Sequence, residues 1–287
     1  MLLQHKGEKM SDKKNDAFGD RVKELESASA KVVLDESQPI CVRLDGKAFH
    51  TFTRGLARPY DERLSKAMID TMNYLVEKTD ARLGYTQSDE ITLIYFKTAP
   101  HQQTYFGSRV QKLNSVLASM ATAKFNHEVN KNIPEKEDVF AFFDCRVWNV
   151  PTLQDVADVM IWRQDDAIKN SISMAAHAKF GDKKILHKNS KEKIEMLAAE
   201  GIDWMAYPDF FKSGTYAMKK FKEVPMPEEL KDKKGNEGKD TFLRSYIDNF
   251  SLKRLRHTEN PVEILFDPVF EIHKQAVAER NSRKKKV

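Results

Sequence analysis

The order of the apolar segments between residues 40 and 150 constrains the fold of this chain more than any other feature of its sequence. Strands are predicted over 40–44, 83–86, 91–96 and 139–143, the last with a short extension to 150, and helices over 61–78 and 104–129. Strand, helix, strand, strand, helix, strand is the order of the ferredoxin-like split unit, so the sequence predicts an α+β fold. Such a sheet places the end of its first strand beside the turn between its two middle strands.

The residue pattern within the segments supports these assignments. Apolar residues recur along 61–78 at the spacing of one helix face, at Leu64, Met68, Met72 and Leu75. The stretch 83–96 instead holds two short apolar runs separated by the polar residues 87–90, which is typical of a hairpin.

The regions that flank this unit divide the chain into three parts. A helix is predicted to begin within 19–27, further helices over 153–179 and 191–199, and an exposed loop over 225–239. The first residues are polar and charged, and the last form the basic run RNSRKKKV. We therefore expect a flexible leader over 1–16, a main domain over 17–220, and a C-terminal extension with a basic tail over 221–287.

Composition excludes several classes of protein. The chain has 287 residues, 40% of them hydrophobic, but its longest apolar runs are too short to cross a membrane, and the N-terminus lacks the apolar centre of a signal peptide. With only Cys41 and Cys145 and no Cys-x-x-Cys pair, a disulfide framework or a thiolate zinc site is not expected, and a cytoplasmic location is. The net charge of +5 favours acidic partners only weakly.

Acidic residues stand at two places that the predicted sheet would bring together. Asp45 ends the first strand, and Asp89 and Glu90 lie in the central hairpin turn. Neighbouring carboxylates repel one another, and a divalent cation removes that cost. Two ions about 4 Å apart can bind a triphosphate and stabilise both the attacking and the leaving oxygen, and oxygen ligands with waters favour Mg²⁺ over zinc. By position alone, turn capping is the more common role of such aspartates, because Asp-Gly is frequent in turns.

The residues that follow Asp45 favour the first interpretation. Gly46 lets the backbone turn sharply, and successive amides after it could cradle phosphates. Positive charge comes from Lys47, His50, Arg54 and Arg58. Combined with the acidic turn of the hairpin, this pattern indicates a phosphate-binding metal site.

Several motifs resemble those of the tRNA-His guanylyltransferase family. They are Val42-Arg-Leu-Asp-Gly-Lys-Ala-Phe-His50, Arg58-Pro59 to Asp61, Gly84-Tyr-Thr-Gln-Ser-Asp-Glu90, Phe143-Asp144-Cys-Arg146 and Trp162-Arg163-Gln164-Asp-Asp. The resemblance covers roughly residues 18–220. The Thr-Gln-Ser-Asp-Glu-Ile-Thr form looks closer to the guanylyltransferase-like 3′–5′ polymerases of bacteria and phages.

This resemblance implies a polymerase-type palm with added C-terminal helices, and an enzyme that extends tRNA at its 5′ end in the 3′–5′ direction. Asp45 and Asp89 would hold two Mg²⁺ ions, with the Gly46 carbonyl as a further ligand and Glu90 in support. The triphosphate would be held by Ser88, Arg58 and the backbone of Gly46, Lys47, Ala48, Phe49 and His50.

The resemblance also implies the substrates and the assembly. Such enzymes transfer AMP from ATP to a 5′-monophosphorylated tRNA, after which the 3′-hydroxyl of an incoming nucleotide such as GTP attacks the activated phosphate. A tRNA that already carries a 5′-triphosphate skips activation. A homotetramer is implied as well, with no membrane partner.

The predicted helix over 153–179 carries a polar stripe opposite an apolar one. The polar stripe is Arg163, Asp166, Asn170 and His177, and the apolar stripe is Ile161, Ile168, Ile172 and Ala175. The polar side chains could face phosphates or simply solvent. Given the family match in this helix, the candidate tRNA or phosphate contacts are Arg163, Lys169, Asn170 and Lys188. His177 is interpreted as structural.

One departure from the family bears on selectivity. Eukaryotic tRNA-His guanylyltransferases carry a His-Ile-Asn-Asn run in this helix, in a region tied to recognition of the tRNA-His anticodon, and here the run is Ala167-Ile168-Lys169-Asn170. The change favours template-directed repair of tRNA 5′ ends over dedicated addition of G−1 to tRNA-His.

Three alternatives differ in what they require of the sequence. A dedicated tRNA-His guanylyltransferase keeps the same enzyme class. A nucleotidyl cyclase should carry a Gly-Gly-Asp/Glu-Glu-Phe turn, and the residues 87–90 do not match it. A non-catalytic RNA-binding ferredoxin-like module should show aromatic residues on an open sheet face and has no need of paired aspartates.

Overall fold

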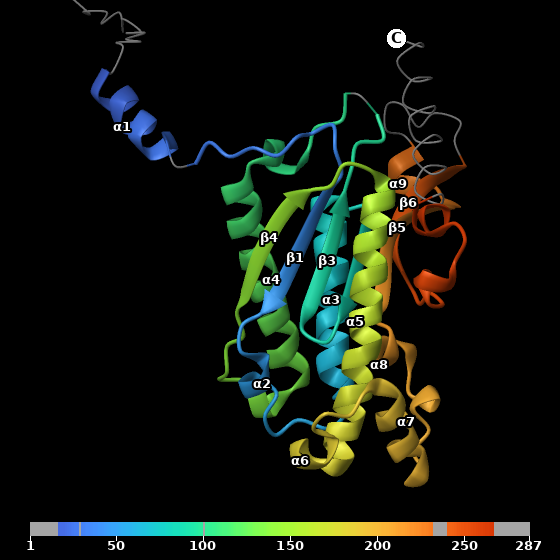
Figure 1. Cartoon of the computed structure of the whole chain (residues 1–287). Helices are drawn as coiled ribbons and strands as arrows, with labels where there is room; N and C mark the ends of the chain where they lie inside the picture. Colours follow the sequence, from blue (N-terminus) through green and yellow to red (C-terminus); the bar gives the residue numbers. More distant parts are fainter. Residues whose placement is uncertain (1–16, 29, 100, 232–239, 267–287) are drawn as a thin grey trace, which may run out of the picture.

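A computed structural model describes residues 17–28, 30–99, 101–231 and 240–266 (Figure 1). The chain combines helices with an antiparallel sheet whose strand order is β4-β1-β3-β2-β5-β6. The strands are β1 Ile40–Gly46, β2 Leu83–Gln87, β3 Glu90–Tyr95, β4 Phe143–Asn149, β5 Thr215–Pro225 and β6 Thr241–Phe250. The helices are α1 Ala17–Ala28, α2 Phe49–Phe52, α3 Glu62–Thr79, α4 Val110–Asn132, α5 Leu153–Phe180, α6 Asp182–Ile185, α7 Ser190–Ala199, α8 Asp209–Lys212 and α9 Glu228–Lys231.

Helices cover both faces of the sheet. Helices α3 and α4 pack on one face, where the alternate β1 residues Val42 and Leu44 meet Met72 and Phe125. Helix α5 crosses the other face, where the buried residues include Cys41, Ile94 and Met160. Because β1 alternates between these two cores, its last residues are fixed in position on both sides. In the described parts of the chain, no helix has both the length and the apolar character needed to cross a membrane.

The predicted succession of strands and helices is present, but two boundaries were wrong. Strand β4 begins at Phe143 and occupies the stretch predicted only as an extension. The backbone of Ala141 bonds instead to the side chain of Asn126 on α4, in both directions at 2.9 Å, which keeps it out of strand pairing. Helix α4 begins at Val110, because Phe106 and Gly107 adopt left-handed backbone angles that end the preceding turn.

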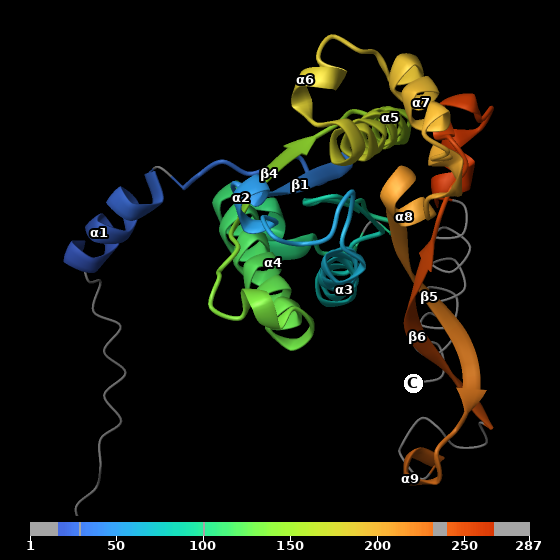
Figure 2. The ribbon, with the colours of Figure 1, turned by 90° about the horizontal axis from the view of Figure 1, so that it is seen from below.

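The strands β5 and β6 were not predicted at all. Figure 2 shows them as a long ribbon that extends past the helices. In β5, only Thr215 to Met218 are buried, and this part lies beside β2. The lysine-rich remainder is mostly exposed and pairs with β6 alone.

Strand β5 runs through residue 220, where we expected the C-terminal extension to start. The predicted leader over 1–16 and the basic tail lie outside the described residues.

Helix α5 buries a polar turn, and one of its residues, Arg163, was predicted to lie in the polar stripe. Arg163, Gln164 and Asp165 are at most 5% exposed, whereas Ile161 and Ile168 of the predicted apolar stripe are only half-buried. The segment after β6 packs against this turn. Gln164 donates to Leu252 O at 3.2 Å and accepts from Leu255 N at 2.7 Å. Asp165 accepts hydrogen bonds from Arg254 and Arg256, which lower its pKa although burial raises it.

Gln164→Ala is expected to lower the free energy of unfolding by about 2–3 kcal/mol, because it leaves a buried N–H and a C=O of the C-terminal segment without their partner. Urea denaturation measures the change. Gln154→Ala, on the exposed start of the same helix, serves as the control and is expected to change it by less than about 0.5 kcal/mol. Equal effects of the two substitutions would contradict this account of the buried turn.

Candidate active site

The pairing of β1 with β3 brings the predicted acidic residues together. Asp45 lies directly opposite Glu90 in the antiparallel register, and the amide of Gly46 donates to the carbonyl of Asp89 at 3.1 Å. The turn between β2 and β3 consists of Ser88 and Asp89, with Ser88 in the left-handed conformation. The end of β1 and the tip of this hairpin therefore form one site.

Glu90 is held by arginines on both sides. Its carboxylate accepts from Arg163 of α5 at 2.6 Å and lies 3.4 Å from the Arg43 guanidinium. Arg43 also donates to Asp45 at 3.1 Å. Arg163 is therefore buried against the sheet and does not belong to an exposed polar stripe, which corrects the prediction for this helix. The chain of contacts links α5 through Glu90 and Arg43 to Asp45.

The carboxyl group of Asp89 has a raised pKa. Burial raises the pKa of its carboxyl, and the negative charges of Asp45 and Glu90 add to that rise, while a hydrogen bond from Ser88 at 3.0 Å opposes it. A cation placed between Asp45 and Asp89 would offset the cost of keeping both carboxylates ionised.

The turn after Asp45 is shaped by Gly46 and Ala48. A Cβ on Gly46 would lie 2.3 Å from the ring of Phe49, so only glycine fits there. Ala48 has a φ of 54°, and the short helix α2 starts directly after it. The amides of Gly46 and Lys47 donate to Asp89 and Phe142 carbonyls. These two hydrogen bonds hold the turn in place beside the hairpin tip.

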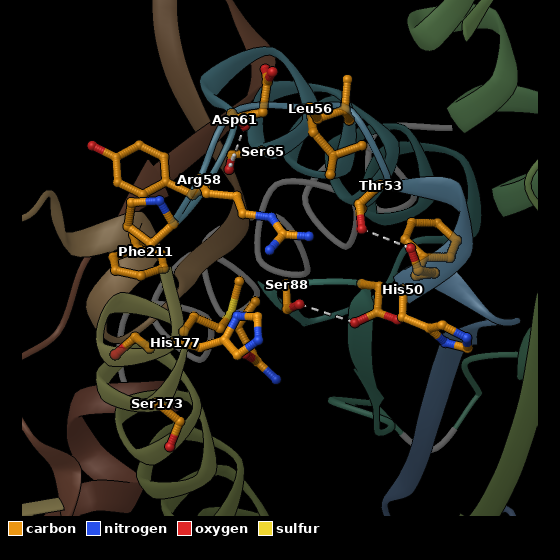
Figure 3. Close-up of a pocket in the computed structure, with 18 of the residues that line it drawn as sticks. His50, Thr53, Leu56, Arg58, Asp61, Ser65, Ser88, Ser173, His177 and Phe211 are labelled. Carbon is orange, nitrogen blue, oxygen red and sulfur yellow. Dashed lines mark hydrogen bonds between the residues drawn. The ribbon is translucent and has the colours of Figure 1, made fainter. Parts of the chain in front are cut away.

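A cavity of about 760 Å³ opens beside this turn (Figure 3). The predicted site residues that line it are Asp45, Gly46, Ala48, Phe49, His50, Arg58, Ser88 and Asp89. Figure 3 shows the guanidinium of Arg58 pointing into the cavity, opposite Ser88. The cavity thus has acidic groups at one end and a cation across from them, as a bound metal–triphosphate group requires.

Some lining residues were missed by sequence reasoning. Helix α5 contributes Ser171, Ser173, Met174 and His177, and Tyr60, Phe210 and Phe211 add an aromatic wall. His177 Nε2 lies 2.9 Å from Asp182 Oδ1, at the cavity rather than inside a core. In the sequence, the only sign that His177 would lie at the cavity was its place in the polar stripe of the helix.

The remaining candidates lie elsewhere. Lys47 and Glu90 do not line the cavity, and neither do Arg163, Lys169, Asn170 and Lys188. Lys169 and Asn170 are exposed on α5. Lys188 pairs with Glu192 at 3.0 Å on the surface.

The donor set at the acidic end fits Mg²⁺. Across the described ranges, no cluster of three or more His, Cys, Asp or Glu side chains could hold a metal. Two carboxylates and a backbone carbonyl, completed by water and phosphate oxygens, are typical of Mg²⁺ and too few for a structural zinc site.

Comparison with known proteins identifies the family. The family model for tRNAHis guanylyltransferase matches residues 19–151, which contain both aspartates. The tRNA(His) guanylyltransferase of Saccharomyces cerevisiae is 31% identical over 199 residues, covering 63% of this chain and 82% of the relative. A protein of Acanthamoeba polyphaga mimivirus is 32% identical over 283 residues, covering 91% and 92%.

Solved structures indicate the same family. A bacterial tRNA(His) guanylyltransferase-like protein in complex with ATP superposes with a TM-score of 0.72 at 35% identity, covering 86% of this chain and 98% of that one. A bacterial protein of the same description in complex with GTP gives a TM-score of 0.68 at 34% identity, covering 87% and 99%. This chain belongs to the tRNA-His guanylyltransferase family. The resemblance seen in the motifs is confirmed, and with it the enzyme class, a nucleotidyltransferase.

The contact between Arg163 and Glu90 can be tested by measuring the free energy of unfolding of variants. Arg163→Met is expected to lower the free energy of unfolding by about 3 kcal/mol, because it leaves a mostly buried carboxylate without its closest partner. Adding Glu90→Gln should recover part of that loss. Thermal or urea denaturation measures both variants.

The exposed pair of Lys188 with Glu192 provides the control. Lys188→Met should change the same free energy by no more than about 0.5 kcal/mol. If the double variant is no more stable than Arg163→Met alone, the two side chains are not coupled as the structure indicates.

Proposed function

We propose that this chain is a Mg²⁺-dependent enzyme that adds nucleotides in the 3′–5′ direction to the 5′ end of tRNA. The observation that carries the proposal is the convergence of Asp45 and Asp89 at one end of a cavity large enough for a nucleotide, opposite Arg58. Membership of the family, and bacterial relatives solved with ATP and with GTP, support it.

We interpret the sheet as a ferredoxin-like, polymerase-type palm. The order β4-β1-β3-β2, with α3 and α4 on one face, supports this, because it places the carboxylates at the same edge of the sheet. The catalytic palm and the helical region that contacts tRNA would lie within residues 17–220. The extension over 221–287 would add β6 and the segment that supports α5.

The proposed roles of these residues follow from their positions in the site. Asp45, Asp89 and the Gly46 carbonyl would hold two Mg²⁺ ions, which would neutralise phosphate charge and activate the attacking oxygen. Arg58, Ser88 and the backbone from Ala48 to His50 would hold the triphosphate of ATP or GTP. Glu90, which is bound by two arginines, would keep Arg43 and hence Asp45 in place rather than bind metal.

Selectivity is proposed to favour repair over dedicated G−1 addition. Ala167, where eukaryotic members carry histidine, is 1% exposed and faces the core, so nothing at this position presents a polar group to RNA. The exposed neighbours Lys169 and Asn170 remain available for backbone contacts. By the same resemblance we propose a homotetramer acting in the cytoplasm.

The activity is tested with Mg²⁺, ATP, labelled GTP and a tRNA that lacks its first 5′ nucleotide, with the base opposite the gap varied. Label is expected at the 5′ end only when the opposite base pairs with G. Asp89→Ala should reduce the rate by more than about 100-fold, because it removes a metal ligand. Asp144→Ala changes an exposed aspartate opposite Asp45 that does not line the cavity, and should retain activity.

The outcomes separate the alternatives. Addition to tRNA-His alone, whatever the opposite base, would establish the dedicated guanylyltransferase. No addition to any tRNA, including one with a 5′-triphosphate, would refute 3′–5′ addition.

Arg58→Ala is expected to raise the KM for ATP by about 10–100-fold, because one charge-assisted contact to phosphate contributes roughly 1.5–3 kcal/mol. Steady-state kinetics of tRNA adenylylation provides the measurement. Arg54→Ala is the matched control, since Arg54 is a nearby exposed arginine outside the cavity. A similar KM for the two variants would remove Arg58 from the triphosphate site.

A further inference from the structure

Trp162 is an exposed aromatic residue at the start of the motif Trp162-Arg163-Gln164, whose other two residues are buried. It is 57% exposed, and the guanidinium carbon of Arg163 lies 3.4 Å from the centroid of its ring. Arg163 is fixed in turn, because it donates to Glu90 at 2.6 Å. The indole is therefore held by a cation–π contact on one side, while much of its surface is open to solvent.

The direction of the Trp162 side chain follows from those of its neighbours. Successive residues of a helix point about 100° apart, so Trp162 and Gln164 lie on opposite sides of Arg163. Gln164 bonds to the segment 252–255, which follows β6, and Arg163 reaches β3. Since the sheet order is β4-β1-β3-β2-β5-β6, Trp162 lies on the side of α5 that faces β1 and β4.

The strands on that side carry positive charge beside the acidic site. In Figure 1, β1 and β4 lie beside α5 rather than beneath it. Because side chains alternate along a strand, Arg43 and Asp45 of β1 and Arg146 of β4 share the face of the sheet on which Cys41 packs below α5. The Arg146 side chain is 57% exposed and lies 3.9 Å from Asp45. Trp162 therefore flanks a basic surface that leads to Asp45.

The surroundings of Trp162 suit a nucleobase better than an apolar protein surface. Its neighbours on the exposed side of α5 are Asp158 one turn before, and Asp166 and Lys169 one and two turns after. A single ring among charged groups offers no apolar patch for another protein to cover. A base has an apolar face and a polar edge, and any base can stack on a tryptophan.

We propose that Trp162 is a stacking platform for the base of the 5′-terminal nucleotide of the tRNA. The base packs on the part of the indole that Arg163 leaves free, and the backbone phosphate meets Arg146. Stacking then positions the 5′ end beside Asp45 and Asp89. The inference rests on the proposed addition of nucleotides to tRNA 5′ ends, and it adds a residue that positions the acceptor.

The acceptor and the triphosphate approach from different sides in this arrangement. Asp45 and Asp89 line the cavity, but Trp162 does not. The first residue of α5 that lines the cavity is Ser171, nine residues after Trp162 and about 14 Å further along the helix axis. A base stacked on Trp162 therefore leaves the cavity free for ATP or GTP.

The test compares the wild type with Trp162→Leu and Trp162→Phe in adenylylation of a 5′-monophosphorylated tRNA. Leucine keeps an apolar cover over Arg163 but has no ring, so kcat/KM for tRNA is expected to fall about 5–150-fold, equivalent to the roughly 1–3 kcal/mol of one stacked base. Phenylalanine keeps a ring and should recover most of that loss. The KM for ATP should stay unchanged in both variants, because the cavity and Arg58 are untouched.

A tRNA whose 5′-terminal nucleotide keeps its phosphate and ribose but lacks its base provides the matching change in the substrate. With the wild type, this abasic tRNA should lower kcat/KM by the same factor, and Trp162→Leu should cause no further loss. Gln154→Ala, at the exposed start of α5, is the control and should leave the kinetics of both tRNAs unchanged. Equal losses from Trp162→Leu on the intact and the abasic tRNA would overturn the proposal, because the substitution would then act without the base.

Tryptophan fluorescence measures binding separately from catalysis. The other two tryptophans, Trp148 and Trp204, are partly buried. Titration with tRNA is expected to quench the emission of the wild type, and Trp162→Phe should lose this quenching but still bind tRNA. Binding with the same quenching in both proteins would refute the platform. Quenching that depends on Trp162, without nucleotide addition to any tRNA, would support the stacking and refute the proposed activity.

Discussion

The antiparallel register of β1 against β3 is the constraint on which the rest of the site depends. It sets Asp45 opposite Glu90 and joins Gly46 to Asp89 by a backbone hydrogen bond. Side chains alternate along a strand, so a slip of one residue would turn Asp45 into the core and Leu44 toward the active site. The two apolar cores on either side of β1 prevent such a slip, because Cys41 and Leu44 are each fully buried on their own face.

The electrostatics of the site follow from that geometry. The acidic groups at this strand end do not share the nearby positive charge equally. Glu90 pairs with two arginines, whereas Asp89 has a raised pKa. The structure therefore separates Glu90, which is fixed by arginines, from Asp89, which lines the cavity. These two residues are neighbours in sequence but have different surroundings.

Much of this could be predicted from the sequence, because it rests on local patterns. The succession of elements from β1 to β4 follows from apolar periodicity, and the acidic turn follows from the hairpin. The buried turn of α5 could not be predicted, since Arg163, Gln164 and Asp165 look like a solvated face until their distant partners are known. Strand β5 was missed because only its first four residues are buried, and the lysines that follow are typical of a loop. Cavity residues such as His177 depend on how α5 lies across the sheet, which periodicity does not determine.

The polar turn of α5 has a consequence for how the protein is made. Its partners, Leu252 to Arg256, lie 88 to 91 residues further along the chain. While the ribosome is still adding those residues, Asp45 and Asp89 have already emerged, but the helix that bonds to Glu90 cannot yet bury Gln164 and Asp165. The hydrogen bonds of Gln164 and Asp165 can therefore be completed only once residues 252 to 256 have been made. A chain released early would carry every residue of the acidic motif and still lack the support that holds it in shape.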